Sequence, residues 1–509
     1  METKTAAIEM RNITKRFGPV LANDKVWLNI YRGEILALLG ENGSGKTTLM
    51  NMLSGIYFPD EGEIKIDGKE VVIRSPKDAF DNGIGMIHQH FKLVDVLTAA
   101  ENIVLGLPGK LDLKAASAKI REICDKYGFS VDPTQKIYDM SVSQKQTVEI
   151  VKVFYRGADI LILDEPTAVL TPQETDKLFA VLRNMRNDGK AIVIITHKMH
   201  EVEALSDRVA ILRHGQFIGD MLTKDTNAQE MTNMMVGHAV SLNIDRPDPV
   251  DPKPRVEVKG LTVRSVDGII KLDDVSFTAN SGEILGIAGI SGCGQKELLE
   301  AIAGLQTVES GSISYIEDDG SREELVGKDP LSIAELGVSL SFVPEDRLGM
   351  GLVGKMNLAD NMMLRSFRRG KSIFTDRRSP RALAEAVVQE LSVSTPSVDT
   401  PVRRLSGGNV QKVLVGREIA SAPTVLLTAY AVRGLDIHSS YTIYDLINRQ
   451  KKAGVAVIFV GEDLDVLLEL CDRILVLCGG KVSGIVPGRG AEKREVGMMM
   501  TKLGGQSHE

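Results

Sequence analysis

The sequence predicts an α/β protein in which parallel β-sheets pack against helices, and it predicts that this fold occurs twice. First, the apolar run 35–39 leads into a glycine-rich loop, and an apolar-periodic stretch follows from Thr48, which is a strand, loop and helix. Second, apolar runs at 160–163 and 191–195 alternate with helical stretches, as in a parallel sheet. Third, Gly33-Glu34-Ile35-Leu36 returns as Gly282-Glu283-Ile284-Leu285, which indicates a duplication.

The first copy begins with short β-rich segments, at 7–12, 26–31, 63–66 and 71–73. Residues 113–127 and 143–154 have helical periodicity, so we expect a mostly helical insert at about 93–150 before the next apolar strand. The segment 209–218 predicts a hairpin that turns at His214-Gly215.

The repeat sets the expected domain boundaries. Its register places Gly40, Gly43 and Gly45 opposite Gly289, Gly292 and Gly294. We therefore expect one domain at 1–240 and another at 256–509, the second with a helical insert at about 355–412. Four prolines within 247–254 predict a stiff, extended spacer in a linker at 241–255.

Composition narrows the classes of function. A chain of 509 residues exceeds a single core, and a formal charge of −7 gives no basic footprint for nucleic acid. Four cysteines without C-x-x-C spacing favour a reducing cytoplasm. No apolar run approaches the ~18 residues of a membrane helix, so we expect any membrane association to be peripheral.

The segment 40–47 fits the phosphate-loop pattern G-x-x-x-x-G-K-[ST]. Glycines let backbone N–H groups close round a β-phosphate, and the following helix points its positive end at the same anion. Lys46 would reach the β- and γ-phosphates, and Thr47 would hold Mg²⁺. The alternative is an ordinary glycine-rich turn, which the flanking strand and helix disfavour. The predicted nucleotide-binding residues here are Gly40, Glu41, Asn42, Gly43, Ser44, Gly45, Lys46, Thr47 and Thr48.

Two carboxylates follow the apolar strand 160–163, namely Asp164 and Glu165. Ligands bind at the carboxyl edge of a parallel sheet. Asp164 would hold Mg²⁺ through water, and Glu165 would orient or deprotonate the attacking water. The alternative is a strand end with two solvated acids.

Four further segments, 87–91, 141–144, 164–167 and 195–198, surround the phosphate loop in an order that resembles the nucleotide-binding domains of ATP-binding cassette (ABC) transporters. The resemblance covers nearly the whole chain, twice. It implies two P-loop NTPase domains, each with a RecA-like core, an antiparallel β subdomain and a helical insert, that hydrolyse ATP with Mg²⁺. It also implies that Gln89 senses γ-phosphate and Mg²⁺, that His197 touches the γ-phosphate and that Phe17 stacks on adenine.

The second copy has lost most of the residues that carry this chemistry. Gln295 and Lys296 replace the loop lysine and threonine. Ala429 and Tyr430 stand opposite Asp164 and Glu165, and a phenol that titrates near ~10 is no base near neutral pH. Glu345 stands opposite Gln89, and Glu462 stands opposite His197. We therefore expect that the second copy alone cannot hydrolyse ATP efficiently.

The second copy nevertheless keeps a sound signature loop, Ser406, Gly407, Gly408 and Asn409, and the aspartate Asp436. The first copy has Ser141, Ser143 and Gln144 in an altered signature. Because cassette domains of this family close head to tail, the resemblance implies one intact composite site and one structural or regulatory site that binds nucleotide weakly. Neutral drift is the alternative, but drift would scatter the losses over both sites. The degenerate site would contain Gly289, Gly292, Gly294, Gln295, Lys296, Glu345, Ala429, Tyr430, Glu462, Ser141, Ser143 and Gln144.

The tandem layout and the run 344–347 resemble the single-chain ATPases of bacterial sugar and nucleoside importers. The segment 85–94 is closer to the nucleoside branch, which works with BMP-type binding proteins. This implies uptake of nucleosides such as guanosine through two permease subunits and an extracellular or periplasmic binding (lipo)protein, with this chain on the cytoplasmic face of the membrane and no contact with solute or nucleic acid. Import of ribose- or galactose-type sugars is the alternative, and a soluble twin-cassette factor acting on ribosomes or DNA is a second one.

Overall fold

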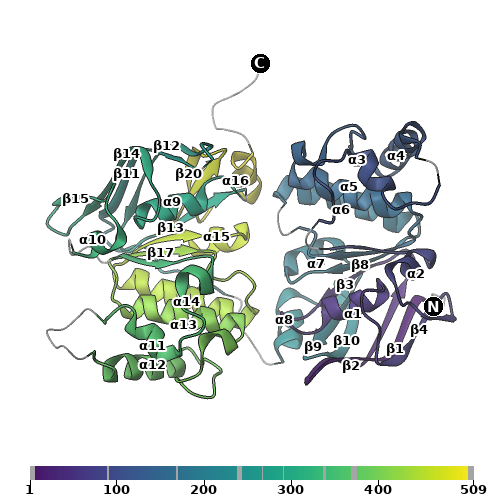
Figure 1. Ribbon diagram of the computed structural model, residues 1–509, viewed down its shortest axis with the longest axis horizontal. Helices are drawn as coiled ribbons and strands as arrows, with labels where there is room; N and C mark the ends of the chain where they lie inside the picture. The colour runs from purple at the N-terminus through teal and green to yellow at the C-terminus, as the bar shows by residue number, and fades with distance from the viewer. Residues whose placement is uncertain are drawn as a thin grey trace. The chain divides into compact units, whose positions relative to one another are not determined.

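The computed structural model describes residues 6–88, 91–109, 111–167, 170–237, 243–265, 267–290, 292–335, 340–367 and 375–501. The chain divides into two units, Met1–Ser241 and Leu242–Glu509. Each unit contains a six-stranded sheet and a four-stranded sheet. In each unit the six-stranded sheet lies between the four-stranded sheet and the helical insert (Figure 1). Gln89 lies outside the described residues, so its predicted role is not placed.

In the first unit the six-stranded sheet has the order β10-β9-β3-β8-β7-β6, and the four-stranded antiparallel sheet has the order β2-β1-β4-β5. The strands are β1 (Ala6–Phe17), β2 (Val20–Tyr31), β3 (Ile35–Leu39), β4 (Glu61–Ile66), β5 (Lys69–Val71), β6 (Ile84–Ile87), β7 (Ile160–Asp164), β8 (Ala191–Ile195), β9 (Arg208–Arg213) and β10 (Gln216–Leu222). The helices are α1 (Lys46–Leu53), α2 (Pro76–Asp81), α3 (Ala99–Val104), α4 (Leu113–Tyr127), α5 (Val142–Tyr155), α6 (Pro172–Asn187), α7 (Met199–Leu205) and α8 (Ala228–Val236).

The second unit repeats this plan, with the orders β16-β17-β18-β13-β19-β20 and β12-β11-β14-β15. Its strands are β11 (Pro254–Arg264), β12 (Ile270–Asn280), β13 (Ile284–Gly289), β14 (Val308–Ile316), β15 (Arg322–Glu324), β16 (Leu340–Val343), β17 (Val425–Ala429), β18 (Ala456–Val460), β19 (Arg473–Cys478) and β20 (Lys481–Pro487). Its helices are α9 (Gln295–Ile302), α10 (Pro330–Glu335), α11 (Leu358–Met363), α12 (Arg378–Glu390), α13 (Gly407–Ala420), α14 (Ile437–Lys452), α15 (Leu464–Leu470) and α16 (Lys493–Met499). The expected α/β fold, with an antiparallel subdomain and a helical insert in each copy, is confirmed.

The central parallel strands are buried on both faces, which is why they are almost purely apolar. Along β7, Ile160 and Ile162 belong to one apolar cluster, whereas Leu161 and Leu163 belong to another. β3, β7 and β8 run parallel, so their carboxyl ends meet at one edge of the sheet. The residues that follow these three strands are therefore brought together there.

Two local expectations differ from the structure. Helix α3 was not predicted, because six residues are too few for a periodic pattern; its capping box, Thr98 with Glu101, defines its start. The predicted strand 71–73 is instead β5, which ends at Val71. The hairpin at His214-Gly215 is confirmed, and both residues have positive φ as a two-residue turn requires.

Side chains of the second unit attach the proline-rich segment before β11. Arg246 is buried and donates a hydrogen bond to the carbonyl oxygen of Cys471. Lys451 Nζ donates to the carbonyl oxygen of Pro247 and forms an ion pair of 2.6 Å with Asp472. Proline removes backbone donors, so side chains of the second unit hold this segment in place.

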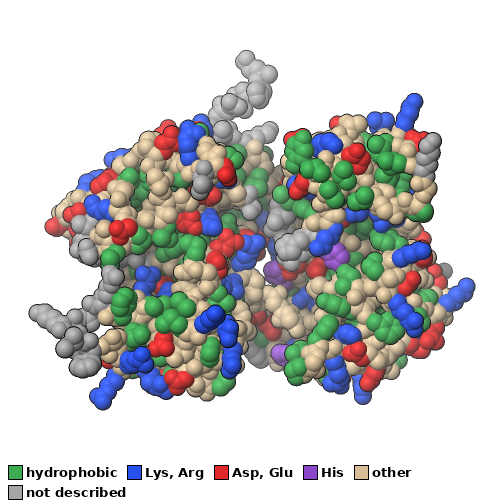
Figure 2. Space-filling model, in the orientation of Figure 1, with side chains coloured by type: hydrophobic (Ala, Val, Ile, Leu, Met, Phe, Trp, Pro, Cys, Tyr) green, Lys and Arg blue, Asp and Glu red, His purple; other side chains and the backbone are tan. Residues whose placement is uncertain are grey.

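The surface carries mixed charge. Acidic and basic side chains are interspersed over the face that Figure 2 shows, where no continuous basic stripe is visible. Among the described residues, none of the helices combines the length and the apolar character that crossing a membrane requires. On this face, charge does not point to a nucleic-acid partner.

Candidate functional site

The phosphate loop lies at the carboxyl end of β3 and leads directly into α1. Gly45 precedes α1 with φ 95°, a left-handed conformation that glycine adopts without strain. A Cβ atom on Gly45 would lie 2.4 Å from the carbonyl oxygen of Ala22, so a side chain there would clash. Gly45 has no side chain, so it offers no acceptor to the N–H groups at the start of α1. The N–H groups of the first turn, which contains Thr47 and Thr48, therefore face the loop. This is the arrangement that binds phosphate.

Lys46 is the buried cation of this loop. It is 7% exposed, and its Nζ donates hydrogen bonds to the carbonyl oxygens of Gly40 at 2.7 Å and Glu41 at 3.0 Å. Burial lowers the pKa of Lys46, and nearby carboxylates, Glu165 foremost, oppose that shift. The buried Ser44 Oγ has no hydrogen-bond partner within the described ranges. An ammonium held only by carbonyls and an unsatisfied hydroxyl both fit a phosphate ligand.

Thr47 and Asp164 bring two hard oxygen ligands together. Thr47 Oγ1 donates to Asp164 Oδ2 at 3.2 Å, and Asp164, the last residue of β7, is 9% exposed. Burial raises the pKa of Asp164, because the charged carboxylate is desolvated. A hydroxyl and a carboxylate are ligands that Mg²⁺ prefers, and a divalent cation would offset the cost of burying this charge. These residues therefore fit the predicted Mg²⁺ site.

Glu165 and His197 form a pair at the same edge. Glu165 has φ 47°, a conformation that is unusual for a side chain of this size, and its N–H donates to the carbonyl oxygen of Ile195 at 2.9 Å. His197 Nδ1 lies 2.8 Å from Glu165 Oε1. Burial raises the pKa of Glu165, but the hydrogen bond from His197 and the charges of His197, Lys46 and Lys198 bring it below its ordinary value. Glu165 is thus an ionised carboxylate at the predicted catalytic position.

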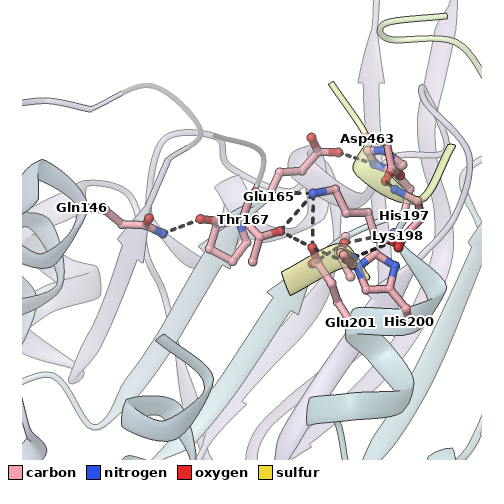
Figure 3. Close-up of polar contacts among 12 residues, drawn as sticks. Gln146, Glu165, Thr167, His197, Lys198, His200, Glu201 and Asp463 are labelled. Carbon is pink, nitrogen blue, oxygen red and sulfur yellow. Dashed lines mark hydrogen bonds and ion pairs between the residues drawn. The ribbon is translucent and has the colours of Figure 1, made fainter. Parts of the chain in front are cut away.

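A buried polar network behind this pair was not predicted. Glu201, which is 4% exposed on α7, accepts hydrogen bonds from Thr167 and from Thr196 at 3.2 Å. Lys198 Nζ lies 3.2 Å from Glu201 Oε1, and its backbone N–H donates to Thr196 Oγ1 at 3.1 Å. Figure 3 shows Thr167 and Lys198 converging on Glu201. The network ties the loop that carries His197 to the loop that follows Glu165.

One further contact fixes the same loop. Gln146 of α5 donates from Nε2 to the carbonyl oxygen of Pro166 at 2.6 Å (Figure 3). The only sequence signal for this network was a glutamate four residues after His197 and a threonine two residues after Glu165. Neither spacing is specific, so the three-dimensional fold is needed to find it.

The predicted adenine platform, Phe17, ends β1 and is 41% exposed. Its ring packs edge-on against Tyr57, with 5.1 Å between ring centroids. The Lys15 ammonium lies 5.6 Å from the centroid of Phe17. The exposure of Phe17 is compatible with stacking on a base, and Tyr57 is an aromatic neighbour that the sequence did not single out.

Both signature loops open a helix. Ser141 caps α5, accepting from Gln144 N at 3.2 Å, and Gln144 Oε1 accepts in return from Ser141 N at 2.8 Å. Ser406 caps α13, and Asn409 Nδ2 donates to Ser406 Oγ at 2.8 Å. The remaining signature residues lie in the first turns of these helices: Ser143, Gly407 and Gly408.

Asp436 and Thr171 are equivalent helix caps. Asp436 accepts hydrogen bonds from Ser439 N at 2.7 Å and Ser439 Oγ at 2.8 Å at the start of α14. Thr171 caps α6 in a capping box with Glu174. The carboxylate of Asp436, predicted to contact ATP, is thus also a structural cap in the second unit.

The second phosphate loop keeps the backbone of the first one without its cation. Gly294 precedes α9 with φ 99°, and Gly292 also has positive φ. Gln295 is 3% exposed and donates from Nε2 to the carbonyl oxygen of Ile290 at 3.1 Å. Lys296 lies 3.7 Å from Glu300 on the same helix. A Cβ on Gly289 would lie 2.6 Å from Gln295 Nε2, so the amide fills the space beside this glycine.

The second acidic strand end is also replaced. Ala429 ends β17, and Tyr430 follows it with φ 51°. Burial and the carboxylates of Glu345 and Glu462 raise the pKa of Tyr430 to about 12. Both carboxylates form ion pairs with Arg433. A phenol with so high a pKa does not serve as a base near neutral pH, so Tyr430 does not replace the carboxylate of Glu165.

Comparison with known proteins agrees with this geometry. The model of the ABC transporter family matches residues 23–168 and 272–428. The nucleoside import ATP-binding protein NupA of Lactococcus lactis is 42% identical over 99% of both chains. The guanosine import ATP-binding protein NupO of Bacillus subtilis is 40% identical over 97% of both, and the glucose import ATP-binding protein TsgD13 of Haloferax volcanii is 40% identical over 98% of this chain and 96% of its own.

Among solved structures, the complex of an archaeal ribosomal stalk protein with the ribosome recycling factor aABCE1 matches 96% of this chain and 92% of that one, with a TM-score of 0.62. At 15% identity this similarity concerns the fold alone. The family match covers a phosphate loop and a central strand in each unit, and the relatives match over almost their full length. The chain therefore belongs to the ABC transporter family and is an ATP-binding cassette ATPase.

Proposed function

We propose that this chain is the ATP-hydrolysing subunit of an importer for nucleosides, with purine nucleosides such as guanosine as substrates. The observation that carries this proposal is the match, over 97–99% of the chain, to two relatives that are named for nucleoside and guanosine import. The segment 85–94, which resembles the nucleoside branch, supports the same assignment.

A sugar importer is the second candidate. It is favoured by the glucose import relative at 40% identity, and by a ribose import ATP-binding protein of Rubrobacter xylanophilus at 38% over 96% of this chain. An ATPase subunit of this kind does not touch the transported molecule, so its sequence reports the substrate only indirectly. The choice between nucleoside and sugar therefore rests on transport experiments.

In this proposal, hydrolysis takes place at one composite site. Lys46, Thr47, Gln89, Asp164, Glu165 and His197 of the first unit act with Ser406, Gly407, Gly408, Asn409 and Asp436 of the second. The chemistry of the two strand ends supports this asymmetry, because Glu165 is ionised whereas burial and carboxylates raise the pKa of Tyr430 to about 12. The second phosphate loop, with Gln295 in place of a lysine, serves as a structural or regulatory site.

At the composite site, positioning and electrostatics do most of the work. Lys46 offsets charge on the β- and γ-phosphates, and Glu165 accepts a proton from, or orients, the attacking water. His197, which lies 2.8 Å from Glu165 Oε1, would contact the γ-phosphate. Mg²⁺, held by Thr47 and Asp164, would supply further charge compensation when bound.

As the ATPase subunit of an importer, the chain would work with membrane permeases and a solute-binding protein. The proposal places the chain on the cytoplasmic face of the membrane, bound to two permease subunits that receive solute from an external binding protein. Because the γ-phosphate cage spans two domains, ATP binding would close them and hydrolysis would release them. This motion would be passed to the permeases.

Uptake of labelled guanosine, ribose and glucose tests the proposal in cells that lack this chain. We expect the wild-type chain to restore guanosine uptake and Glu165→Gln to fail. If only a sugar responds, the second candidate is correct and the catalytic assignment stands. If Glu165→Gln restores uptake as well as the wild type does, the catalytic assignment is wrong.

A further inference from the structure

Arg347 joins two loops of the second unit. It follows β16 and donates from Nη1 to the carbonyl oxygen of Gly407, in the signature loop, at 3.3 Å. Its Nη2 donates to the carbonyl oxygen of Arg433, in the loop after β17. Asp346 accepts hydrogen bonds from the backbone N–H groups of Leu348 and Gly349, and so fixes the turn that carries Arg347. A planar guanidinium suits this double contact because its donors are fixed in a fork.

A second guanidinium secures the other end of this link. Arg433 forms an ion pair with Glu345 and another, at 3.0 Å, with Glu462. Its guanidinium also lies 5.9 Å from the centroid of the Tyr430 ring. Single exposed ion pairs contribute little to stability. Here, however, Arg433 follows β17 and pairs with one carboxylate after β16 and another after β18, so one cation links the ends of three strands. The loop that accepts from Arg347 is therefore anchored on both sides.

The glycine at 407 is part of the same arrangement. A Cβ atom on Gly407 would lie 3.2 Å from Arg347 Nη1, closer than ordinary van der Waals contact. A side chain there would push the guanidinium away from the carbonyl oxygen that it contacts. The contact thus combines an arginine at 347 with a glycine at 407, whose missing side chain leaves room for the guanidinium.

The first unit has neither residue. With Gln89 opposite Glu345, the alignment places Phe91 opposite Arg347 and Val142 opposite Gly407. Phe91 has no donor, and Val142 carries a branched side chain at the position where Gly407 has none. The link is thus confined to the unit whose signature loop is sound.

We propose that Arg347 and Arg433 are positioning residues that hold the signature loop of the second unit ready for the ATP bound by the first unit. This inference rests on the composite site of the proposed function. Glu345 and Glu462 stand where the family has groups that respond to nucleotide, and Arg433 neutralises them with a cation that belongs to the protein. The second unit therefore keeps its signature loop in place without a nucleotide of its own.

The variant Arg347→Gln in the purified full chain tests this role. We expect kcat/KM for MgATP to fall about tenfold, because two hydrogen bonds from a charged donor are lost. The dissociation constant of ADP should stay within about twofold of wild type, because ADP lacks the γ-phosphate that the signature loop helps to hold. Hydrogen exchange of the amides at 406–410 should become faster in the absence of nucleotide. Arg404→Gln, an equal change of charge three residues before Gly407, is the matched control. It should change neither kcat/KM nor the hydrogen exchange of the amides at 406–410.

Gly408→Asp separates this inference from the composite site itself, because it places a carboxylate in the signature loop. If Gly408→Asp abolishes turnover while Arg347→Gln matches Arg404→Gln, the positioning role is wrong and the composite site stands. If Gly408→Asp leaves turnover intact, the composite site is wrong. Should Arg347→Gln fail to fold, Arg347→Lys replaces it: an ammonium cannot span both carbonyl oxygens as a fork does, so wild-type kcat/KM and wild-type exchange in that variant would overturn the inference.

Discussion

The residue that follows β7 in the first unit and the residue that follows β17 in the second have the same backbone conformation but different side chains. Glu165 has φ 47° and Tyr430 has φ 51°. The N–H of each donates to the neighbouring strand at 2.9 Å, to Ile195 in one unit and to Val460 in the other. The duplication has kept a costly backbone conformation in both copies and exchanged the side chain in one. The backbone conformation at this position has therefore been kept, while the side chain has changed.

The exchanged residues also differ in the cost of burial. The first unit buries the charges of Lys46 and Asp164. Desolvation lowers the pKa of Lys46 and raises that of Asp164, and both shifts favour the neutral form. The second unit has Gln295 and Ala429 at these positions, where no charge is buried. The Thr167–Glu201 hydrogen bond likewise gives way to two valines that pack against an apolar core, Val432 and Val466. At these four positions the second unit therefore carries no charge.

The largest effect is expected when the first loop is made like the second. Lys46→Gln removes the buried ammonium and should lower ATP turnover by about a hundredfold to a thousandfold. The reciprocal change, Gln295→Lys, should add no turnover, because Ala429 and Tyr430 still lack the acidic groups. Phosphate release by the purified full chain measures both. A gain of turnover in Gln295→Lys would show that the second site does not need acidic groups at 429 and 430.

A smaller effect is expected on stability from the network behind His197. Glu201→Ala leaves Thr167 and Lys198 without their buried acceptor and should reduce the free energy of unfolding by about 2 to 3 kcal/mol. Urea titration can be followed by the fluorescence of Trp27, the single tryptophan, which lies on β2 of the first unit. Val466→Ala, at the equivalent position of the second unit, should leave the Trp27 transition unchanged. Equal shifts in both variants would contradict a role specific to the first unit.

The smallest effect concerns the pH dependence of stability. Because burial raises the pKa of Asp164 above its ordinary value of 3.8, the folded state is penalised once that carboxyl ionises. Asp164→Asn removes this penalty and should stabilise the apoprotein at neutral pH. The difference should shrink as the pH falls through the raised pKa and vanish below the ordinary value of 3.8, where the carboxyl is protonated in both states. A destabilised Asn variant at neutral pH would show that Asp164 is held by favourable interactions instead.

Much of the fold and of the site can be predicted from the sequence because the signals are local. The phosphate loop, the acidic strand end at Asp164 and the repeat register each occupy a few contiguous residues, and β3 and β8 have the predicted bounds. The network around Glu201 and the link through Arg347 depend on residues that only the fold brings together. Charged residues on loops have no periodic signature, so their partners could not be assigned in advance.

The proline-rich segment illustrates the same limit. Its composition predicts an extended chain between the repeats, but composition does not say what such a chain packs against. Lys451 and Arg246 attach it to the second unit through backbone carbonyl oxygens, which any sequence provides.

In the proposed function, one unit supplies the base for hydrolysis. ATP turnover by Glu165→Gln and by Tyr430→Phe tests it directly, because each change removes one group from the same backbone position in one unit. We predict that Glu165→Gln lowers turnover by at least about a hundredfold, whereas Tyr430→Phe stays within about twofold of wild type. Comparable losses in the two variants would contradict the claim.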